Sequence, residues 1–160
     1  MAWSNSKGFG ALFEDALENT QAFDLSGGTP KAALYNNTTA PDETVTTANT
    51  AYAVGQWVVG NEVDDGTNWD TGGEPITTPT FARTGATGSH VLTLDGVDTP
   101  QGGATTTLAA VFGTLVYDDG QTTPVANAGY AYVYFGGTQD VTAGNFTIIW
   151  HTNGIMQMSF

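Results

Sequence analysis

The sequence contains no cysteine and only three lysine or arginine residues, against sixteen aspartate or glutamate residues. Without cysteine, the chain cannot form a disulfide or use a thiolate as a nucleophile or metal ligand. The formal net charge of −13 at pH 7 repels phosphate groups, so it argues against binding to nucleic acid or to anionic membrane surfaces. Any partner is expected to be apolar or positively charged.

Long hydrophobic runs are also missing. No apolar stretch approaches the length of a membrane span. Residues 1–20 reach Glu14 and Asp15 before the apolar region of a signal peptide develops, so we expect no secretory signal. The protein is expected to remain where it is made, or to leave as part of something larger.

The sequence does have enough apolar material for one folded domain. Hydrophobic residues make up 40% of its 160 residues, and a chain of this length buries roughly 70% of the surface that it exposes when unfolded. We find neither an internal repeat nor a disordered linker. The expectation is therefore a single domain, 1–160.

The N-terminal region predicts a short amphipathic helix at about residues 6–19. Apolar side chains recur there with helical spacing, at Phe9, Leu12, Phe13, Ala16 and Leu17. Ser6 is expected to cap the helix, and Glu14 is expected on its solvent side. The apolar stripe should lie on a sheet or on a neighbouring subunit.

Strand-forming residues separated by glycine, proline, asparagine and threonine dominate the rest of the sequence. Strands are predicted at 31–35, 56–59, 76–82, 90–94, 105–117, 130–135, 145–152 and 155–160, and a short helical turn at 47–52. Segment 105–117 is apolar on both faces, which predicts a central strand with a bulge or bend at Gly113. The expected class is mainly β: an antiparallel β-sandwich or barrel with a short N-terminal amphipathic helix.

Asn153-Gly154 lies between the last two predicted strands and favours a tight β-hairpin. A two-residue turn would place Trp150 opposite Gln157, and Ile149 opposite Met158. Both faces of such a hairpin are apolar. We assign the face with the larger aromatic area to the core; it carries Phe146, Ile148, Trp150 and Ile155.

The second face of the hairpin is predicted to be an interface, either between copies of this protein or against a protein lattice. Methionine side chains adapt to the shape of a partner, and a terminal phenylalanine can insert into a neighbour. The predicted interface comprises Ile149, His151, Met156, Met158 and Phe160, together with Phe9 and Phe13 of the helix.

Neither histidine predicts catalysis. His90 alternates with Leu92 and Leu94, and His151 shares the apolar face just described. Ser89 points to the side of its strand opposite to His90, whereas a hydrolytic triad needs its members to meet in space. We expect no enzymatic activity, no catalytic residues and no cofactor.

The acidic segment 61–75 admits a calcium-binding interpretation. Carboxylate oxygens suit calcium, and this segment offers those of Glu62, Asp64, Asp65, Asp70 and Glu74. Their spacing differs from that of the EF-hand loop. A solvated turn built around an Asp-Asp-Gly sequence is the simpler interpretation, and we expect no metal site.

Three tyrosines alternate along one predicted strand, at Tyr130, Tyr132 and Tyr134. Such a row fits a platform for sugar rings. More often, such a row is a half-buried strand whose hydroxyl groups reach the edge of a core or interface.

Three runs of the sequence resemble a family of small virion proteins encoded by tailed bacteriophages, notably phages of actinobacteria. The runs are KAALYNNTTAPDETVTTANTAYAVGQWVVGNEV (31–63), AAVFGTLVYDD (109–119) and YFGGTQDVTAGNFTIIWHTNGIMQM (134–158). The N-terminal helix fits this family too. The resemblance covers nearly the whole chain and rests on these local runs, not on a catalytic motif.

The resemblance implies a capsid decoration (cement) protein on the outer surface of the mature phage head. The implied partners are the lattice of the major capsid protein and copies of the protein itself, for example in a trimer. No active-site residues are implied. Similar proteins are also described as tail or structural proteins, so the alternative is a tail or receptor-binding module that contacts a host glycan.

Overall fold

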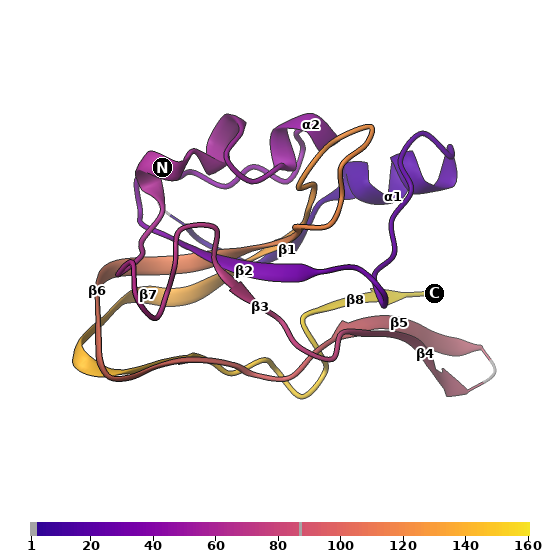
Figure 1. Cartoon of the computed structure of the whole chain (residues 1–160). Helices are drawn as coiled ribbons and strands as arrows, with labels where there is room; N and C mark the ends of the chain where they lie inside the picture. Colours follow the sequence, from indigo (N-terminus) through magenta and orange to yellow (C-terminus); the bar gives the residue numbers. More distant parts are fainter. Residues whose placement is uncertain (1–2, 87) are drawn as a thin grey trace.

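The computed structural model describes residues 3–86 and 88–160, with only the backbone described for residues 100–104. In this part of the chain, two antiparallel sheets pack together, and a short helix lies near the N-terminus (Figure 1). One sheet has five strands in the order β1-β7-β6-β2-β3, and the other has three in the order β4-β5-β8. The structure confirms a mainly β protein with the architecture of a β-sandwich.

The bounds of the strands are β1 Lys7–Gly8, β2 Pro30–Tyr35, β3 Glu74–Pro75, β4 Thr80–Ala86, β5 Ser89–Asp95, β6 Thr99–Asp118, β7 Gly129–Ile148 and β8 Met156–Ser159. The helical elements are α1 Gly10–Leu17, α2 Thr47–Thr50, and two 3₁₀ turns, η1 Gly55–Trp57 and η2 Val59–Asn61.

β6 and β7 form a long hairpin that belongs to both layers of the molecule. Their pairing runs from Tyr117 opposite Gly129 to Thr99 opposite Ile148. The register shifts repeatedly along β6 between residues 101 and 113, where the hairpin bends and passes from one layer to the other (Figure 1). Bulges bend strands and increase their twist, so these irregularities allow one hairpin to enclose the core from two sides.

Segment 105–117 is a central strand, as predicted, because β6 lies between β7 and β2. Gly113 lies at one of the register shifts, which confirms the predicted irregularity. Packing gives this position a second reason to be glycine. A Cβ atom there would lie 2.4 Å from the Trp3 ring and 2.4 Å from the Val133 carbonyl oxygen. Glycine therefore lets Trp3 pack directly on the sheet.

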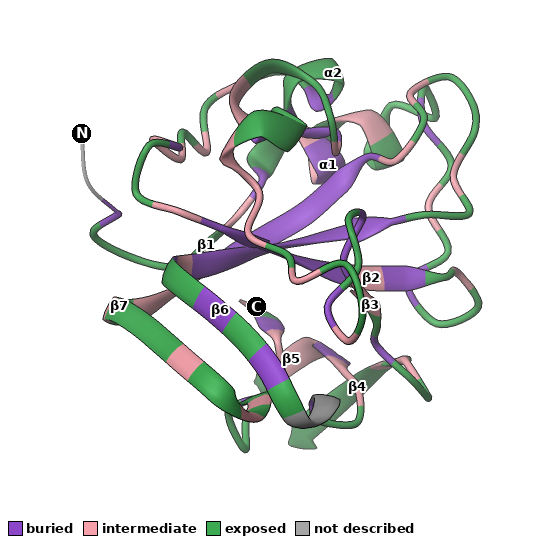
Figure 2. Cartoon of the chain, turned by 60° about the vertical axis from the view of Figure 1, so that its left-hand side comes forward, coloured by how far each residue is buried: buried purple, intermediate pink, exposed green. Residues whose placement is uncertain are grey.

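Two hydrophobic cores lie on the two faces of the five-stranded sheet. Alternate residues of β2 show the division, because Leu34 packs into one core and Tyr35 into the other. The core between the sheets includes Leu94, Leu108, Val111, Val116, Ile148 and Trp150. The second core is largely aromatic, with Trp3, Phe9, Tyr35, Trp57, Tyr117 and Tyr132. Figure 2 shows the buried central strands, and the alternation of buried and exposed residues along the outer half of β6.

The N-terminal helix is shorter than predicted. α1 covers Gly10–Leu17, and the residues before it pair with β7 as strand β1. Ser6 is not the N-cap; its hydroxyl accepts a hydrogen bond from the backbone N–H of Tyr134 at 2.9 Å. Glu14 is exposed to solvent, as predicted.

The predicted strands at 31–35, 90–94, 105–117 and 130–135 and the helical turn at 47–52 are confirmed. The strand at 56–59 is wrong, because this segment forms the turns η1 and η2. Here the Tyr35 hydroxyl donates a hydrogen bond to the Trp57 carbonyl at 2.7 Å. This bond holds the segment over the face of the sheet instead of at its edge. Of the strand at 76–82, only the part from Thr80 onward is in β4.

The predicted C-terminal hairpin is wrong. β7 ends at Ile148, and β8 pairs with β5, which places Met158 opposite Leu92. Neither the pairing of residues 150 and 157 nor that of 149 and 158 is present. The turn itself exists: the Gly154 N–H donates to the His151 carbonyl at 2.7 Å. It carries the chain from one sheet to the other and does not fold it back.

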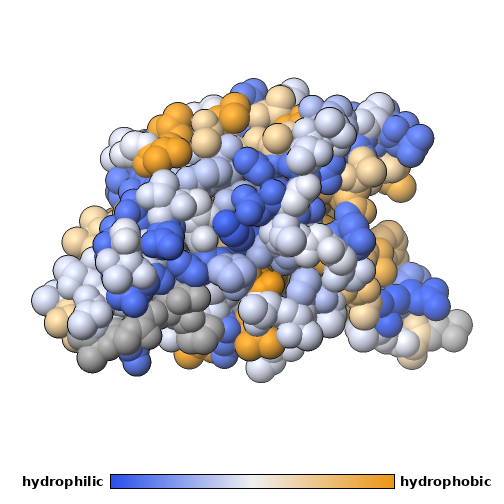
Figure 3. All heavy atoms as spheres, viewed as in Figure 1, coloured by the Kyte–Doolittle hydropathy of each residue, from blue (hydrophilic) through white to orange (hydrophobic). Residues whose placement is uncertain are grey.

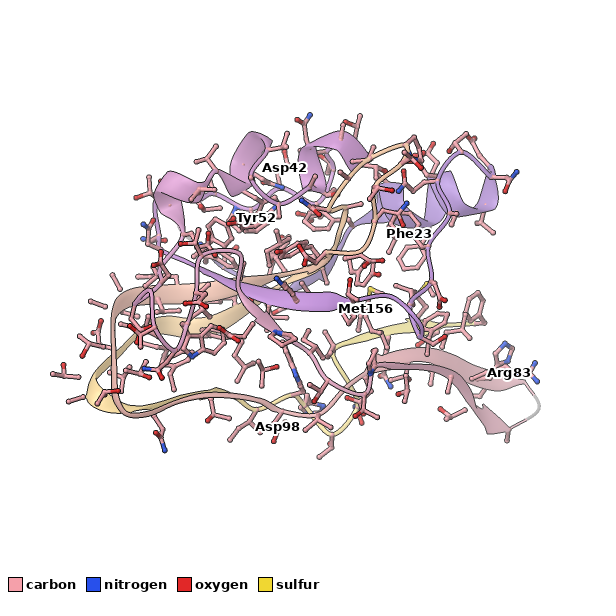
Figure 4. All side chains as sticks on the ribbon, viewed as in Figure 1. Phe23, Asp42, Tyr52, Arg83, Asp98 and Met156 are labelled. Carbon is pink, nitrogen blue, oxygen red and sulfur yellow. The ribbon has the colours of Figure 1, made fainter. Side chains whose placement is uncertain are left out.

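Two hydrogen bonds from backbone N–H groups explain this crossing. The Trp150 N–H donates to the side-chain carboxylate of Asp98, the residue before β6 (labelled in Figure 4), at 2.9 Å. The Ile155 N–H donates to the Leu94 carbonyl of β5 at 2.8 Å. Only four residues lie between Trp150 and Ile155, so the chain must cross from Asp98 to β5 within this short segment. The assignment of one face to the core is nevertheless confirmed, for the buried residues Ile148 and Trp150 and for the partly buried Phe146 and Ile155.

Candidate docking groove

Three of the predicted interface residues lie together at an open groove between α1 and the three-stranded sheet. They are Phe13, Met158 and Phe160. The groove has a volume of about 680 Å³. Figure 3 shows apolar residues in the notch on the side where α1 and the β4–β5 hairpin project.

The other four predicted interface residues lie elsewhere. Phe9 and Met156 are buried in the cores of the protein itself, so their assignment to an interface is wrong. The Phe9 N–H donates to the Tyr130 carbonyl at 3.0 Å, and Met156 lies between the sheets (Figure 4). Ile149 and His151 are exposed, but they line a separate pocket; their role in an interface stays a prediction.

The first wall of the groove is the apolar side of α1. Leu12, Phe13, Ala16 and Leu17 all line it, with the helical spacing seen in the sequence. Leu12, near the start of the helix, is buried, whereas Leu17, at its end, is 89% exposed. The helix therefore packs on the core with its first part and presents uncovered apolar side chains with its last turn.

The second wall is the inner side of the three-stranded sheet. Paired residues in antiparallel strands point to the same side, so Leu92 and Met158 lie next to each other. Further into the sheet, the pair Leu94 and Met156 is buried in the core. Leu92 and Met158 are only partly covered, and Phe160 is 67% exposed. The sheet thus extends beyond the core that covers it.

Phe160 is held at the mouth of the groove by His90. The two rings stack, with centroids 5.4 Å apart and planes inclined by 12°. The Phe160 N–H also donates to the His90 carbonyl at 3.1 Å. The other histidine, His151, accepts a hydrogen bond at Nδ1 from the Asn153 N–H at 3.1 Å. Both histidines thus have packing or turn-forming contacts.

Sequence reasoning missed the groove residues Phe23, Phe81 and Leu92. Phe23, on the chain that follows α1, packs edge-on against the Tyr130 ring with centroids 6.1 Å apart (Figure 4). The alternation of apolar residues in β5 was visible in the sequence. Which end of that strand remains uncovered depends on where α1 lies, and no local pattern specifies that position.

The tyrosine row is broken by a bulge. Tyr117 pairs with Gly129 and Val116 pairs with Ala131, so Tyr130 is the extra residue in β7. A bulge re-aims a side chain: Tyr130 packs into the core between the sheets, whereas Tyr132 packs into the aromatic core. Both rings are buried. They cannot stack on a sugar, and the interpretation of this row as a sugar platform is wrong.

Asp65 organises the acidic segment from within. Its Oδ1 accepts hydrogen bonds of 2.7–3.0 Å from the backbone N–H groups of Thr67, Asn68 and Trp69. Desolvation favours a higher pKa for Asp65, but these backbone hydrogen bonds together outweigh it and lower the pKa to about 2. This carboxylate is a turn-forming group, as the simpler interpretation of the segment predicts.

Glu62 joins two parts of the molecule. Its carboxylate accepts hydrogen bonds from the Tyr52 hydroxyl at 2.7 Å and from the Gly72 N–H at 2.8 Å, and burial raises the pKa of Glu62. Across residues 3–86 and 88–160, no group of three or more His, Cys, Asp or Glu side chains is placed to hold a metal ion. Glu62 and Asp65 both serve as acceptors of hydrogen bonds within the protein.

Replacing Asp65 with alanine should destabilise the protein in a pH-dependent way. The pKa of Asp65 is about 2 when folded, against an ordinary value of 3.8, so its ionised form stabilises the fold above pH 3.8. This contribution is lost as the pH falls toward 2. Urea unfolding of wild type and variant should therefore differ at neutral pH and converge in acid. The control is the exposed Asp70→Ala; a difference for Asp65→Ala that is constant across this pH range would contradict the assignment.

Calcium should not change the stability of the protein. Glu62 and Asp65 already accept hydrogen bonds, and so does Glu74, from the Asp70 N–H at 3.1 Å. The melting temperature is expected to be the same in EDTA and in excess calcium. A fall of many degrees in EDTA that calcium reverses would show that the acidic segment binds the ion.

A scan against protein-family models finds no match to this chain, and searches of curated proteins and of solved structures find none either. In the part of the chain that the structure describes, no helix is long and apolar enough to cross a membrane. Function is therefore inferred from the groove, from the charge of the surface and from the resemblance of the sequence.

Proposed function

We propose that this protein is a structural subunit of a virion, a decoration (cement) protein that binds the outer surface of a mature bacteriophage head and stabilises its lattice. The observation that supports a binding role is the apolar groove, which stays open to solvent in a protein with a net charge of −13. Concentrated exposed apolar surface is typical of interaction sites. The capsid as partner comes from the sequence resemblance.

Such a protein acts by binding and catalyses no reaction. DNA packed in a phage head pushes the shell outward, and a protein that spans neighbouring capsid subunits adds buried area across their joints. Because it binds the mature lattice and not the immature one, it stabilises the mature state by mass action. Copies of the protein, for example in a trimer, would present several grooves to the lattice at once. Their acidic outer surfaces would keep concentrated virions apart.

Binding to purified heads tests the proposal. The protein should co-sediment with mature empty heads of the phage that encodes it, and it should raise the temperature at which filled heads release their DNA. Unexpanded heads are the control and should not bind the protein. If the protein binds no form of the head and immunolabelling places it on the tail, the capsid role is wrong and a tail module replaces it.

A further inference from the structure

We propose that the groove between α1 and the three-stranded sheet binds a segment of a different protein, one that is apolar at its centre and carries lysine or arginine beside the apolar residues. This inference rests on the proposed role as a binding subunit and specifies the chemistry of the partner. The walls of the groove give the first evidence. Among the residues that the structure describes, Ser159 is the one polar residue that lines the groove, and the other lining residues are apolar. An occupant must therefore insert apolar side chains.

The end of α1 next to the groove is acidic. Glu14 and Glu18 do not line the groove, but both are exposed and lie close to Leu17, at which α1 ends. Glu18 continues the last helical turn, since its N–H donates to the Glu14 carbonyl at 2.9 Å. Their side chains are therefore neighbours, and like charges at this spacing repel. In residues 3–86 and 88–160, the ion pair that forms is elsewhere, between Lys31 and Asp119 at 3.1 Å. A positive group from a partner would relieve this repulsion.

Charge argues against a second copy of this protein as the occupant. Each copy has a net charge of −13, so docking one copy into another brings two strongly negative surfaces together. A basic partner is attracted instead. Arg83 is exposed in the middle of β4, where it pairs with Leu92 of the sheet wall (Figure 4). The basic residues of the partner should therefore lie toward α1, and its apolar residues between α1 and Met158.

A known mode of recognition has these features. An amphipathic helix binds with its apolar side in a groove, and its own side chains, spaced three and four residues apart, make the contacts. The volume of about 680 Å³ lies within the range of sites that enclose several apolar groups, roughly 300–1,000 Å³. An occupant of this kind would cover both Leu17 and Phe160, the most exposed apolar residues at the groove.

Selection from a random peptide display library tests the chemistry without assuming a partner sequence. Peptides selected on the wild-type protein should have an apolar centre with lysine or arginine beside it. Their binding should weaken as the salt concentration rises. In the NMR spectrum of labelled protein, they should shift the methyl signals of Leu17, Leu92 and Met158. Selected peptides that are acidic, a failure to select any peptide, or shifts confined to other residues would overturn the proposal.

Four variants test whether the selected peptides bind at the groove. Leu17→Gln, at an exposed position, should weaken binding of the selected peptides several-fold, and the double change Glu14→Gln with Glu18→Gln should weaken it about tenfold and flatten its salt dependence. Ile149→Gln is the matched apolar control, because Ile149 is 77% exposed and lies outside the groove. The double change Asp64→Asn with Asp70→Asn is the matched charge control. Both controls should bind like wild type; equal losses in test and control variants would overturn the proposal.

The same variants separate this inference from the proposed function. If wild-type protein binds the selected peptides but no phage head, the capsid role fails and the groove chemistry stands. If heads bind Leu17→Gln and the double glutamate variant as well as wild type, the capsid role stands and the groove is not the docking site. If wild-type protein self-associates in sedimentation and Leu17→Gln abolishes this, the occupant is a second copy and the inference is wrong.

Discussion

Replacing Trp57 with alanine is expected to lower the free energy of unfolding by about 3–5 kcal/mol. Trp57 is fully buried at the centre of the aromatic core. Its ring lies 5.0 Å from that of Tyr35, 5.8 Å from that of Trp3 and 6.1 Å from that of Tyr132, measured between centroids. Its indole N–H has no hydrogen-bond partner among the described residues, so the loss on truncation is one of packing. Since proteins of this kind are stable by about 5–15 kcal/mol, one substitution should remove much of the total.

Urea unfolding followed by circular dichroism measures this effect, and the neighbouring residue supplies the control. Val58 is next in the chain and is 41% exposed, so Val58→Ala should change the stability much less than Trp57→Ala, by about 0.5 kcal/mol. Trp57→Phe keeps an aromatic ring in the core and should cost less than Trp57→Ala. If Trp57→Ala costs no more than Val58→Ala, Trp57 does not anchor the turns η1 and η2 on the aromatic core as described.

The second large effect is expected at Asp118, a buried carboxylate at the end of β6. Its Oδ1 accepts hydrogen bonds from the backbone N–H of Thr29 at 3.1 Å and of Gly120 at 2.9 Å. Its Oδ2 accepts one from the Tyr130 hydroxyl at 2.9 Å. Asp118→Ala leaves the buried Tyr130 hydroxyl without this partner, and a buried unsatisfied group costs about 1–3 kcal/mol. Thr29 and Gly120 are exposed, so water replaces part of what their N–H groups lose. A loss of about 2–4 kcal/mol is therefore expected in the same urea experiment.

Two milder changes test whether these hydrogen bonds are the cause. Asp118→Asn keeps an oxygen that can accept from the two backbone groups, so it should cost much less than Asp118→Ala. Tyr130→Phe removes a single hydrogen bond and should cost about 1 kcal/mol. Because Asp118 and Tyr130 are in contact, the double variant should cost less than the sum of the two single changes. Additive losses would show that the contact does not contribute.

Local patterns were enough to predict the elements that depend on their own residues. The apolar spacing from Leu12 to Leu17 predicted a helix, and its start was misplaced only because residues 7–8 have a strand partner in β7. The sequence of β2 is apolar on both faces of the strand, and in the structure Leu34 and Tyr35 pack into opposite cores. In these segments, burial and hydrogen bonding follow from residues a few positions apart.

The failures share one physical cause, the choice of a partner distant in sequence. The Asn153-Gly154 signal specifies a turn, but β5 determines where the strand after it pairs, and Leu92 and Leu94 lie about sixty residues earlier. Tyr130 looks like a member of an alternating row until the pairing with β6 makes it a bulge. The groove depends on the same kind of information, because Phe13, Leu92 and Met158 meet only through the packing of three separate elements.

The β6–β7 hairpin that belongs to both layers has a consequence for how the protein unfolds. Neither core can lose its packing alone, since the hairpin that carries residues of one also carries residues of the other. Heat or denaturant should therefore melt both cores in one cooperative transition. The groove draws its two walls from α1 and β8, near opposite ends of the sequence, so it exists only in the fully folded chain. A ligand that binds there binds only the native state. The melting temperature of the protein should therefore rise with the concentration of the ligand, and this rise measures the affinity.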